Sequence, residues 1–182
     1  MIKAIAMIAD GTEEVECLAV VDILRRAGVP TDLVAAANKT VTTSHGITLT
    51  AGKTAGEVDF SQADLIFVPG GLEGSKNLAA CKPLIDGIAA ALRNGKRVAA
   101  ICAAPALVLG ANGFLVGKRA ICFPSFEDKM TGAAVELGAR VVTDGNITTA
   151  RGLGCAIELG LELVRLTVGE KQAAELKEKI QF

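Results

Sequence analysis

Residues 97–109 read Arg-Val-Ala-Ala-Ile-Cys-Ala-Ala-Pro-Ala-Leu-Val-Leu. Residues 98–101 form a short, continuous apolar run, which is the pattern of a parallel strand covered on both faces. From Ala103 onward the composition is typical of a buried helix. The segment therefore predicts a strand that turns sharply into a helix, a nucleophile elbow, with Cys102 at the junction on the carboxyl edge of a parallel sheet.

Cys102 is the candidate nucleophile at this junction. The free N–H groups and the positive dipole end of the following helix point at such a residue and favour a thiolate. A thiol in that field is expected to have a lowered pKa and to be nucleophilic and oxidisable. The residue type alone supports equally well a small buried hydrophobic side chain, because free cysteine is among the most buried residue types.

Composition limits the classes of protein that fit the chain. With 51% hydrophobic and 21% charged residues, residues 1–182 suit a single globular domain with a three-layer core. A formal net charge of -1 gives no electrostatic case for a nucleic-acid or membrane partner. The N-terminal segment lacks a cleavable signal and no apolar run is long enough to cross a bilayer, so we expect a cytoplasmic location.

Several common sites are missing from the sequence. The five cysteines are scattered and odd in number, with no Cys-x-x-Cys pair, so neither a disulfide framework nor a zinc site is indicated. A phosphate loop needs Lys directly after its second Gly and then Ser or Thr, and Gly74-Ser75-Lys76-Asn77 meets neither requirement. Residues 152–157 lack the third glycine of a dinucleotide fingerprint. We therefore expect no metal and no cofactor.

Strands and helices alternate along the chain. Apolar runs predict strands at residues 3–9, 31–37, 65–68, 98–101, 119–123, 140–143 and 146–150. Helical spacing predicts a helix capped by Thr12 and ended by Gly28, a helix after Cys102, and helices at residues 83–94, 155–166 and 170–180. Residues 41–50 are Thr-rich and predict a hairpin or an extended edge segment with His45 at its tip. This order favours an α/β fold with a doubly wound, mostly parallel sheet and helices on both faces.

The carboxyl ends of the predicted strands carry the polar candidates. Residues 10–12, Gly70 with Gly71, Cys102, and Arg151 with Gly152 should converge there, because ligands of such sheets gather at that edge. The sequence contains one histidine, His45, far from Cys102 in the chain. A conventional cysteine protease or glutamine amidotransferase is therefore disfavoured, since its triad needs an imidazole beside the thiol.

Four segments together resemble the DJ-1/ThiJ/PfpI superfamily, and specifically its DJ-1 branch. They are Glu13-Glu14-Val15-Glu16, Pro69-Gly70-Gly71, residues 99–105 (Ala-Ala-Ile-Cys-Ala-Ala-Pro) and Arg151-Gly152-Leu153-Gly154. The resemblance covers essentially the whole chain in the same order. It implies a fold of the flavodoxin-like or class I glutamine amidotransferase-like type.

The resemblance also implies roles for individual residues. Cys102 matches the family's reactive nucleophile, and Glu16 matches an acid that stays protonated and hydrogen-bonds the thiolate. Gly71 and Ala103 match backbone donors around the sulfur. A carboxyl in an apolar pocket beside a thiolate has a raised pKa, so Glu16 could move protons without an imidazole. The alternative for Glu16, a carboxylate that favours a helix N-terminus, would suffice for Glu13 or its neighbour.

The sequence departs from the family pattern at several positions. Phe123 stands where some members carry a histidine, and Ala103 stands where protease-like members do. Leu153 and Cys155 replace the usual Pro and the usual Thr or Ser. Cys155 is a near-site thiol or, as we favour, a small buried side chain.

Family members often form dimers in which residues near Arg26 and His45 lie close to the partner's site. On that analogy we expect a homodimer, with Arg26 and His45 as substrate or dimer-site contacts beside Gly70 and Arg151. For Arg26, a solvated helix residue is an equally good interpretation.

Two functions follow from the resemblance. The first is a cofactor-independent cysteine enzyme of the glyoxalase III or deglycase type, acting on methylglyoxal, related small aldehydes or their early protein adducts and releasing a hydroxy acid. The second is a redox-responsive protective protein or chaperone of oxidative stress, in which Cys102 is oxidised to a sulfinate that Glu16 hydrogen-bonds. Peptidase activity is a weak third.

Overall fold

The computed structural model describes residues 2–182, so Met1, the first residue of the predicted domain, lies outside the described residues. A seven-stranded sheet forms its centre, in the order β10-β11-β7-β6-β1-β2-β5. Neighbouring strands are parallel except for the antiparallel pair β10 and β11. The strands are β1 (Ala4–Ile8), β2 (Thr31–Ala35), β5 (Lys53–Thr54), β6 (Leu65–Val68), β7 (Arg97–Ile101), β10 (Val141–Asp144) and β11 (Ile147–Ala150).

Two small sheets accompany the large one. The antiparallel strands β3 (Thr40–Thr42) and β4 (Thr48–Thr50) form a hairpin, and the turn between them carries His45. The parallel strands β8 (Arg119–Ala120) and β9 (Ala134–Val135) lie beyond β10. The hairpin is the arrangement that the Thr-rich alternation predicts.

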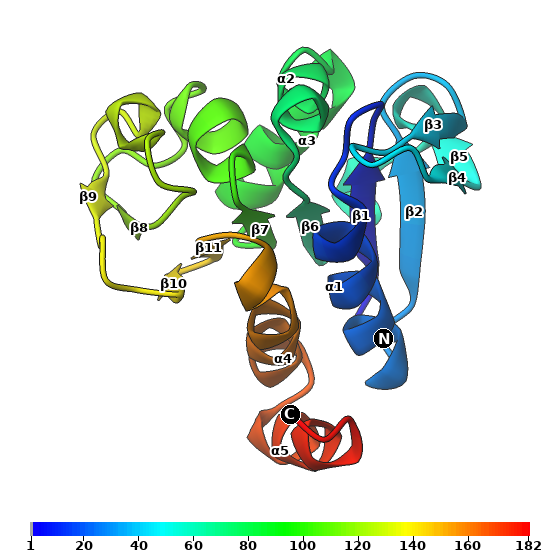
Figure 1. Ribbon diagram of the computed structural model, residues 1–182, viewed down its shortest axis with the longest axis vertical. Coiled ribbons are helices and arrows are strands. Elements are labelled where there is room, and N and C mark those ends of the chain that lie inside the picture. Colours follow the sequence, from blue (N-terminus) through cyan, green and yellow to red (C-terminus); the bar gives the residue numbers. More distant parts are fainter. Residues whose placement is uncertain (1) are drawn as a thin grey trace.

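Helices cover both faces of the large sheet (Figure 1). They are α1 (Glu14–Arg26), α2 (Leu72–Ala79), α3 (Lys82–Arg93), α4 (Ala156–Thr167) and α5 (Glu170–Lys179), with a π-helix at Pro105–Gly110. Side chains of α1, α4 and α5 form one core cluster with Ala6, Phe67 and Ala99 of the sheet. Side chains of α2, α3 and the π-helix form the other cluster with Met7, Ile66 and further residues that alternate with the first set. Both faces are apolar, as continuous apolar strand runs predict.

The predicted fold class is confirmed: the protein is an α/β fold with a mostly parallel sheet between two helical layers. No helix among residues 2–182 is both long and apolar enough to cross a bilayer.

The structure corrects three local predictions. Helix α2 is not among the predicted helices; it packs so closely on the loop after β1 that a side chain at Gly74 would lie 2.5 Å from the Thr12 nitrogen. The predicted strand over residues 119–123 ends at Ala120. Glu13, not Thr12, caps α1, because its Oε2 accepts the Glu16 N–H at 2.6 Å.

Candidate functional site

Cys102 follows the last residue of β7 and adopts a left-handed backbone conformation, with φ of 64°. Such a conformation is strained for a residue other than glycine and is found where the surrounding structure holds it. Here the Cys102 N–H donates to the Ala150 carbonyl at 2.9 Å, and the Cys102 carbonyl accepts the Phe123 N–H at 2.8 Å. The half-buried thiol is therefore fixed at the carboxyl edge of the sheet.

Glu16 enters the same place from the first turn of α1 and is only 1% exposed. Gly70, which follows β6, lies against both residues. A Cβ built on Gly70 would collide with Glu16 Oε2 and would lie 2.5 Å from the Cys102 Cβ. Only a glycine fits there, and its small size is what lets the carboxyl and the thiol approach one another.

The environment raises the pKa of both groups. Burial raises the pKa of Glu16 to about 7, helped by the charge of Glu13 and opposed by hydrogen bonds with Cys102 and with the N–H groups of Gly70 and Leu153. Burial, followed by the charge and hydrogen bond of Glu16, raises the pKa of Cys102 to about 12. The expected lowered thiol pKa is therefore wrong: the N–H groups of Gly71 and Ala103 do lower it, but burial and Glu16 outweigh them.

These two values describe a coupled pair rather than independent groups. Between about pH 7 and about pH 12 the pair holds one proton, which resides on the Glu16 carboxyl or on the Cys102 sulfur. Glu16 Oε2 is buried and has no well-formed hydrogen bond to any of residues 2–182. A buried carboxylate oxygen without a partner is costly, whereas a protonated Oε2 can donate to the sulfur.

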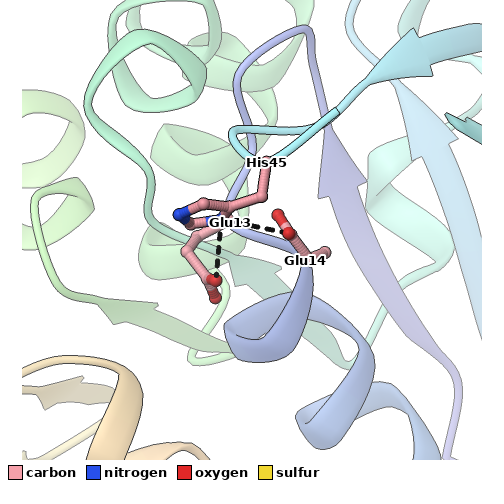
Figure 2. Close-up of side chains that lie close together, drawn as sticks. All are labelled: Glu13, Glu14 and His45. Carbon is pink, nitrogen blue, oxygen red and sulfur yellow. Dashed lines mark hydrogen bonds and ion pairs between the residues drawn. The ribbon is translucent and has the colours of Figure 1, made fainter. Parts of the chain in front are cut away.

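Three further side chains gather at the start of α1 (Figure 2). Glu13 and Glu14 are buried, and the exposed His45 reaches over them from the β3–β4 turn. His45 Nδ1 lies 3.0 Å from Glu14 Oε1 and 3.8 Å from Glu13 Oε1, and Ser44 Oγ donates to Glu14 Oε2 at 3.2 Å. Although burial opposes it, hydrogen bonds with its own backbone, Thr43 and Ser44, together with the charge of His45, lower the pKa of Glu14.

The donor atoms of Glu13, Glu14 and His45 lie within 4.8 Å of one another, a spacing that a cation could bridge. His45 Nδ1 already has a partner in this group, since it lies at hydrogen-bonding distance from Glu14 Oε1. We therefore describe the group as a hydrogen-bonded cluster.

Other predicted site residues lie outside this cluster. Arg26 pairs with Asp22 at 2.5 Å on the exposed surface of α1, ten residues and thus roughly 15 Å of helix from Glu16. Arg151 is exposed, and its N–H donates to the Arg140 carbonyl. Cys155 is 4% exposed and belongs to the apolar core, as the interpretation of a small buried side chain predicts.

Phe123 and Leu153 lie at the rim of the site, although the sequence singles them out only as departures from the family pattern. Phe123 is 46% exposed and its ring lies against Gly152, where a Cβ would come within 3.2 Å of it. Leu153 is 48% exposed, and its backbone N–H acts on the Glu16 carboxyl. The Leu153 contact was missed, because it depends on a backbone group that no side-chain motif marks.

Comparison with known proteins places this arrangement in a family. The model of the DJ-1/PfpI family matches residues 2–166. Protein DJ-1 homolog B of Arabidopsis thaliana is 38% identical over 96% of this chain and 40% of its own length, so the chain spans about two-fifths of that relative. The protein named glutathione-independent glyoxalase DJR-1.2 of Caenorhabditis elegans is 29% identical over 92% of this chain and 89% of its own length.

A solved structure agrees over the full chain. The structure described as Toxoplasma gondii DJ-1, oxidized, superposes with a TM-score of 0.96 at 30% identity, covering 100% of this chain and 99% of that one. The family match, the full-length similarity and the shared fold lead to one conclusion: the chain belongs to the DJ-1/PfpI family.

Proposed function

We propose that the protein is a cofactor-independent cysteine enzyme of the glyoxalase III or deglycase type. Its substrates would be methylglyoxal and related 2-oxoaldehydes, or their early adducts with proteins, and its product a 2-hydroxy acid. The observation that carries the proposal is the Cys102–Glu16 pair, a strained, half-buried thiol and a buried carboxyl that hold one proton between them. The name of the Caenorhabditis elegans relative supports the choice of reaction.

The first step is addition of the Cys102 thiolate to the aldehyde carbon. A bond forms between sulfur and C1, and the carbonyl oxygen becomes an oxyanion that takes a proton from Glu16, giving a hemithioacetal. The N–H groups of Gly71 and Ala103 act on the sulfur and so lie beside the position where this oxyanion develops. These donors are backbone groups held by the sheet edge, so they need no reorganisation during the reaction.

The second step moves hydrogen within the substrate. The Glu16 carboxylate removes the C1 proton to give an enediolate, and the proton on the C1 oxygen passes to the C2 oxygen. Glu16 then returns its proton to C2, and a hydroxyacyl thioester remains on Cys102. C1 is thereby oxidised and C2 reduced, so no external oxidant is needed. Water then hydrolyses the thioester, which releases the hydroxy acid and restores the thiol, and the net reaction adds one water to the 2-oxoaldehyde.

The test is a methylglyoxal-to-lactate assay without added thiol or metal. Wild type is compared with Cys102→Ala, which removes the nucleophile, and with Glu16→Gln, which removes the proton carrier but preserves the size of the side chain. Turnover in wild type that disappears in both variants supports the proposal. Retained turnover in both variants refutes the roles given to the pair.

A second candidate function rests on a different observation. Cys102 is the one cysteine among those at positions 17, 81, 102, 122 and 155 that is not buried. We therefore also consider a redox-responsive protein whose Cys102 is oxidised to a sulfinate. Mass spectrometry after mild peroxide should find oxygen on Cys102 before the other four, and uniform oxidation would count against this function. We do not propose peptidase activity, because His45 is engaged with Glu14.

The expected setting and assembly complete the proposal. We propose a single-domain protein that acts in the cytoplasm as a homodimer, with no nucleic-acid or membrane partner. The five cysteines are free, which fits a reducing compartment. Light scattering should give twice the mass of the 18.7 kDa chain, and a monomer mass would contradict the dimer.

A further inference from the structure

Glu13 stands between the exposed His45 imidazole and the buried Glu16 carboxyl. Its Oε2 accepts the Glu16 N–H at 2.6 Å, and its Oε1 lies 3.8 Å from His45 Nδ1. Its own N–H donates at 3.0 Å to the carbonyl of Gly70, the glycine that touches both Glu16 and Cys102. Glu13 is 8% exposed, so this is a buried charge fixed by three contacts, and the proposed mechanism gives it no task.

We propose that Glu13 is a positioning residue for the proton of the Cys102–Glu16 pair. Its fixed negative charge beside Glu16 shifts that proton toward the carboxyl and so increases the fraction of the pair in which the sulfur is the nucleophilic thiolate. The inference rests on the proposed roles of Cys102 and Glu16, but its test needs no turnover.

The physical reason is that the singly protonated pair has two arrangements. In one the carboxyl is neutral and the sulfur is a thiolate, and in the other the proton is on the sulfur and the carboxylate is charged. A like charge disfavours the charged form of the group nearest to it. After burial, Glu13 is the next influence that raises the pKa of Glu16, whereas the influences on the Cys102 pKa are burial, Glu16 and two backbone N–H groups. The charge of Glu13 thus disfavours mainly the arrangement in which the Glu16 carboxylate is charged and the proton is on the sulfur.

Other groups near Glu16 also influence how the proton is shared between Glu16 and Cys102. The N–H groups of Gly70 and Leu153 stabilise the Glu16 carboxylate and so oppose Glu13. Burial and the two acidic neighbours raise the pKa of Cys17 to about 12, so this thiol on the same helix stays neutral. From the β3–β4 turn, a protonated His45 partly offsets Glu13, but its nearer partner is Glu14.

The experiment is the pH dependence of Cys102 alkylation by iodoacetamide, followed by mass spectrometry of the peptide that contains Cys102. Wild type is compared with Glu13→Gln, which keeps a side-chain oxygen for the Glu16 N–H but removes the charge. Glu14→Gln is the matched control, because it removes a neighbouring charge that is not among the main influences on the Glu16 pKa. Glu13→Ser is a second neutral variant, and serine is a preferred N-cap residue, so it should keep the start of α1 in place.

The inference predicts how the pH profile of the alkylation rate changes in each variant. From pH 5 to 6 the wild-type and Glu13→Gln rates coincide, because Glu16 is then neutral and Glu13 acts weakly on the sulfur. At higher pH the Glu13→Gln profile reaches its plateau at a lower pH, and that plateau is about three- to tenfold lower, as expected for loss of one nearby like charge. Glu13→Ser shows the same change, and Glu14→Gln keeps the wild-type midpoint.

Two results would overturn the inference. A Glu13→Gln or Glu13→Ser profile with the wild-type midpoint and plateau would show that the charge has no influence. A rate lowered by one factor at every pH would show that Glu13 only holds the start of α1 in place. Failure of wild type to convert methylglyoxal would refute the proposed function instead, and the alkylation profiles distinguish the two failures.

Discussion

Replacing Gly70 by alanine would place a methyl group inside the contact between Cys102 and Glu16. The new carbon would lie 2.5 Å from the Cys102 Cβ and 3.0 Å from the Ile101 carbonyl oxygen, and it would overlap Glu16 Oε2. Carbon atoms in contact are normally at least about 3.5 Å apart, so the thiol and the carboxyl must separate by ~1 Å. Gly70 is therefore a position where the site has no room for a side chain.

The magnitude of the effect follows from that displacement. Overpacking a rigid interior site costs about 1–3 kcal/mol. With a urea m-value of about 2 kcal/mol/M for a chain of this size, the unfolding midpoint should fall by roughly 0.5–1.5 M. A reacting group misplaced by ~1 Å can lose about a hundredfold in rate, so methylglyoxal turnover by Gly70→Ala should fall by that order.

The assay pairs urea unfolding, followed by circular dichroism, with the lactate assay. Gly154→Ala is the matched control. Gly154 follows Leu153 at the rim of the site, but a Cβ added there meets nothing within 4 Å. Gly154→Ala should retain the wild-type midpoint and turnover. If Gly70→Ala and Gly154→Ala behaved alike in both measurements, the close contact through Gly70 would be refuted.

Two further predictions concern stability. Because burial raises the folded pKa of Glu16 from 4.5 to about 7, the folded protein binds more protons than the unfolded chain between these values. Wild type should therefore lose about 3 kcal/mol of unfolding free energy relative to Glu16→Gln as pH rises from 4.5 to 7, measured by urea titrations across that range, and parallel curves would contradict the raised pKa. Thr149→Val should lower the free energy of unfolding by about 1–3 kcal/mol, because the buried Thr149 Oγ1 accepts the Ile121 N–H at 2.9 Å. Thr149→Ser keeps the hydroxyl and should keep most of the stability. Equal urea unfolding midpoints for the two variants would argue against this hydrogen bond.

The architecture was predictable because its signals are local. Continuous apolar runs such as residues 98–101 mark strands that are buried on both faces. Asp144-Gly145 is a dipeptide typical of tight turns, and it joins the antiparallel strands β10 and β11. Helix α2 was not predictable in this way, because its stability comes from packing against the loop at Thr12 rather than from its sequence. Strand β5 has two residues and exists only by pairing with β2.

The site was predictable in its members but not in its electrostatics. The topology of a parallel sheet brings Cys102, Gly70 and the start of α1 to one edge, and the structure does bring Glu16 there. The pKa of the Cys102 thiol was argued from the following helix alone, whereas the larger influences are burial and the Glu16 charge, which depend on tertiary packing. His45 pairs with Glu14 across 31 residues of sequence, a contact that no motif indicates.

The dimer remains a prediction, as do the substrate and the roles of Cys102 and Glu16. The exposed side chains of Phe123 and Leu153 form an apolar rim at the site. The proposed mechanism uses no imidazole and depends on the Cys102 thiolate, so removing that thiol tests it most simply.

The most direct measurement is lactate formed from methylglyoxal by wild type, Cys102→Ala and Cys155→Ala, without added thiol or metal. Cys155 is buried in the core and serves as the matched cysteine control. We predict turnover in wild type and in Cys155→Ala and none in Cys102→Ala. Equal lactate formation by Cys102→Ala and wild type would contradict the claim that the Cys102 thiolate attacks the aldehyde.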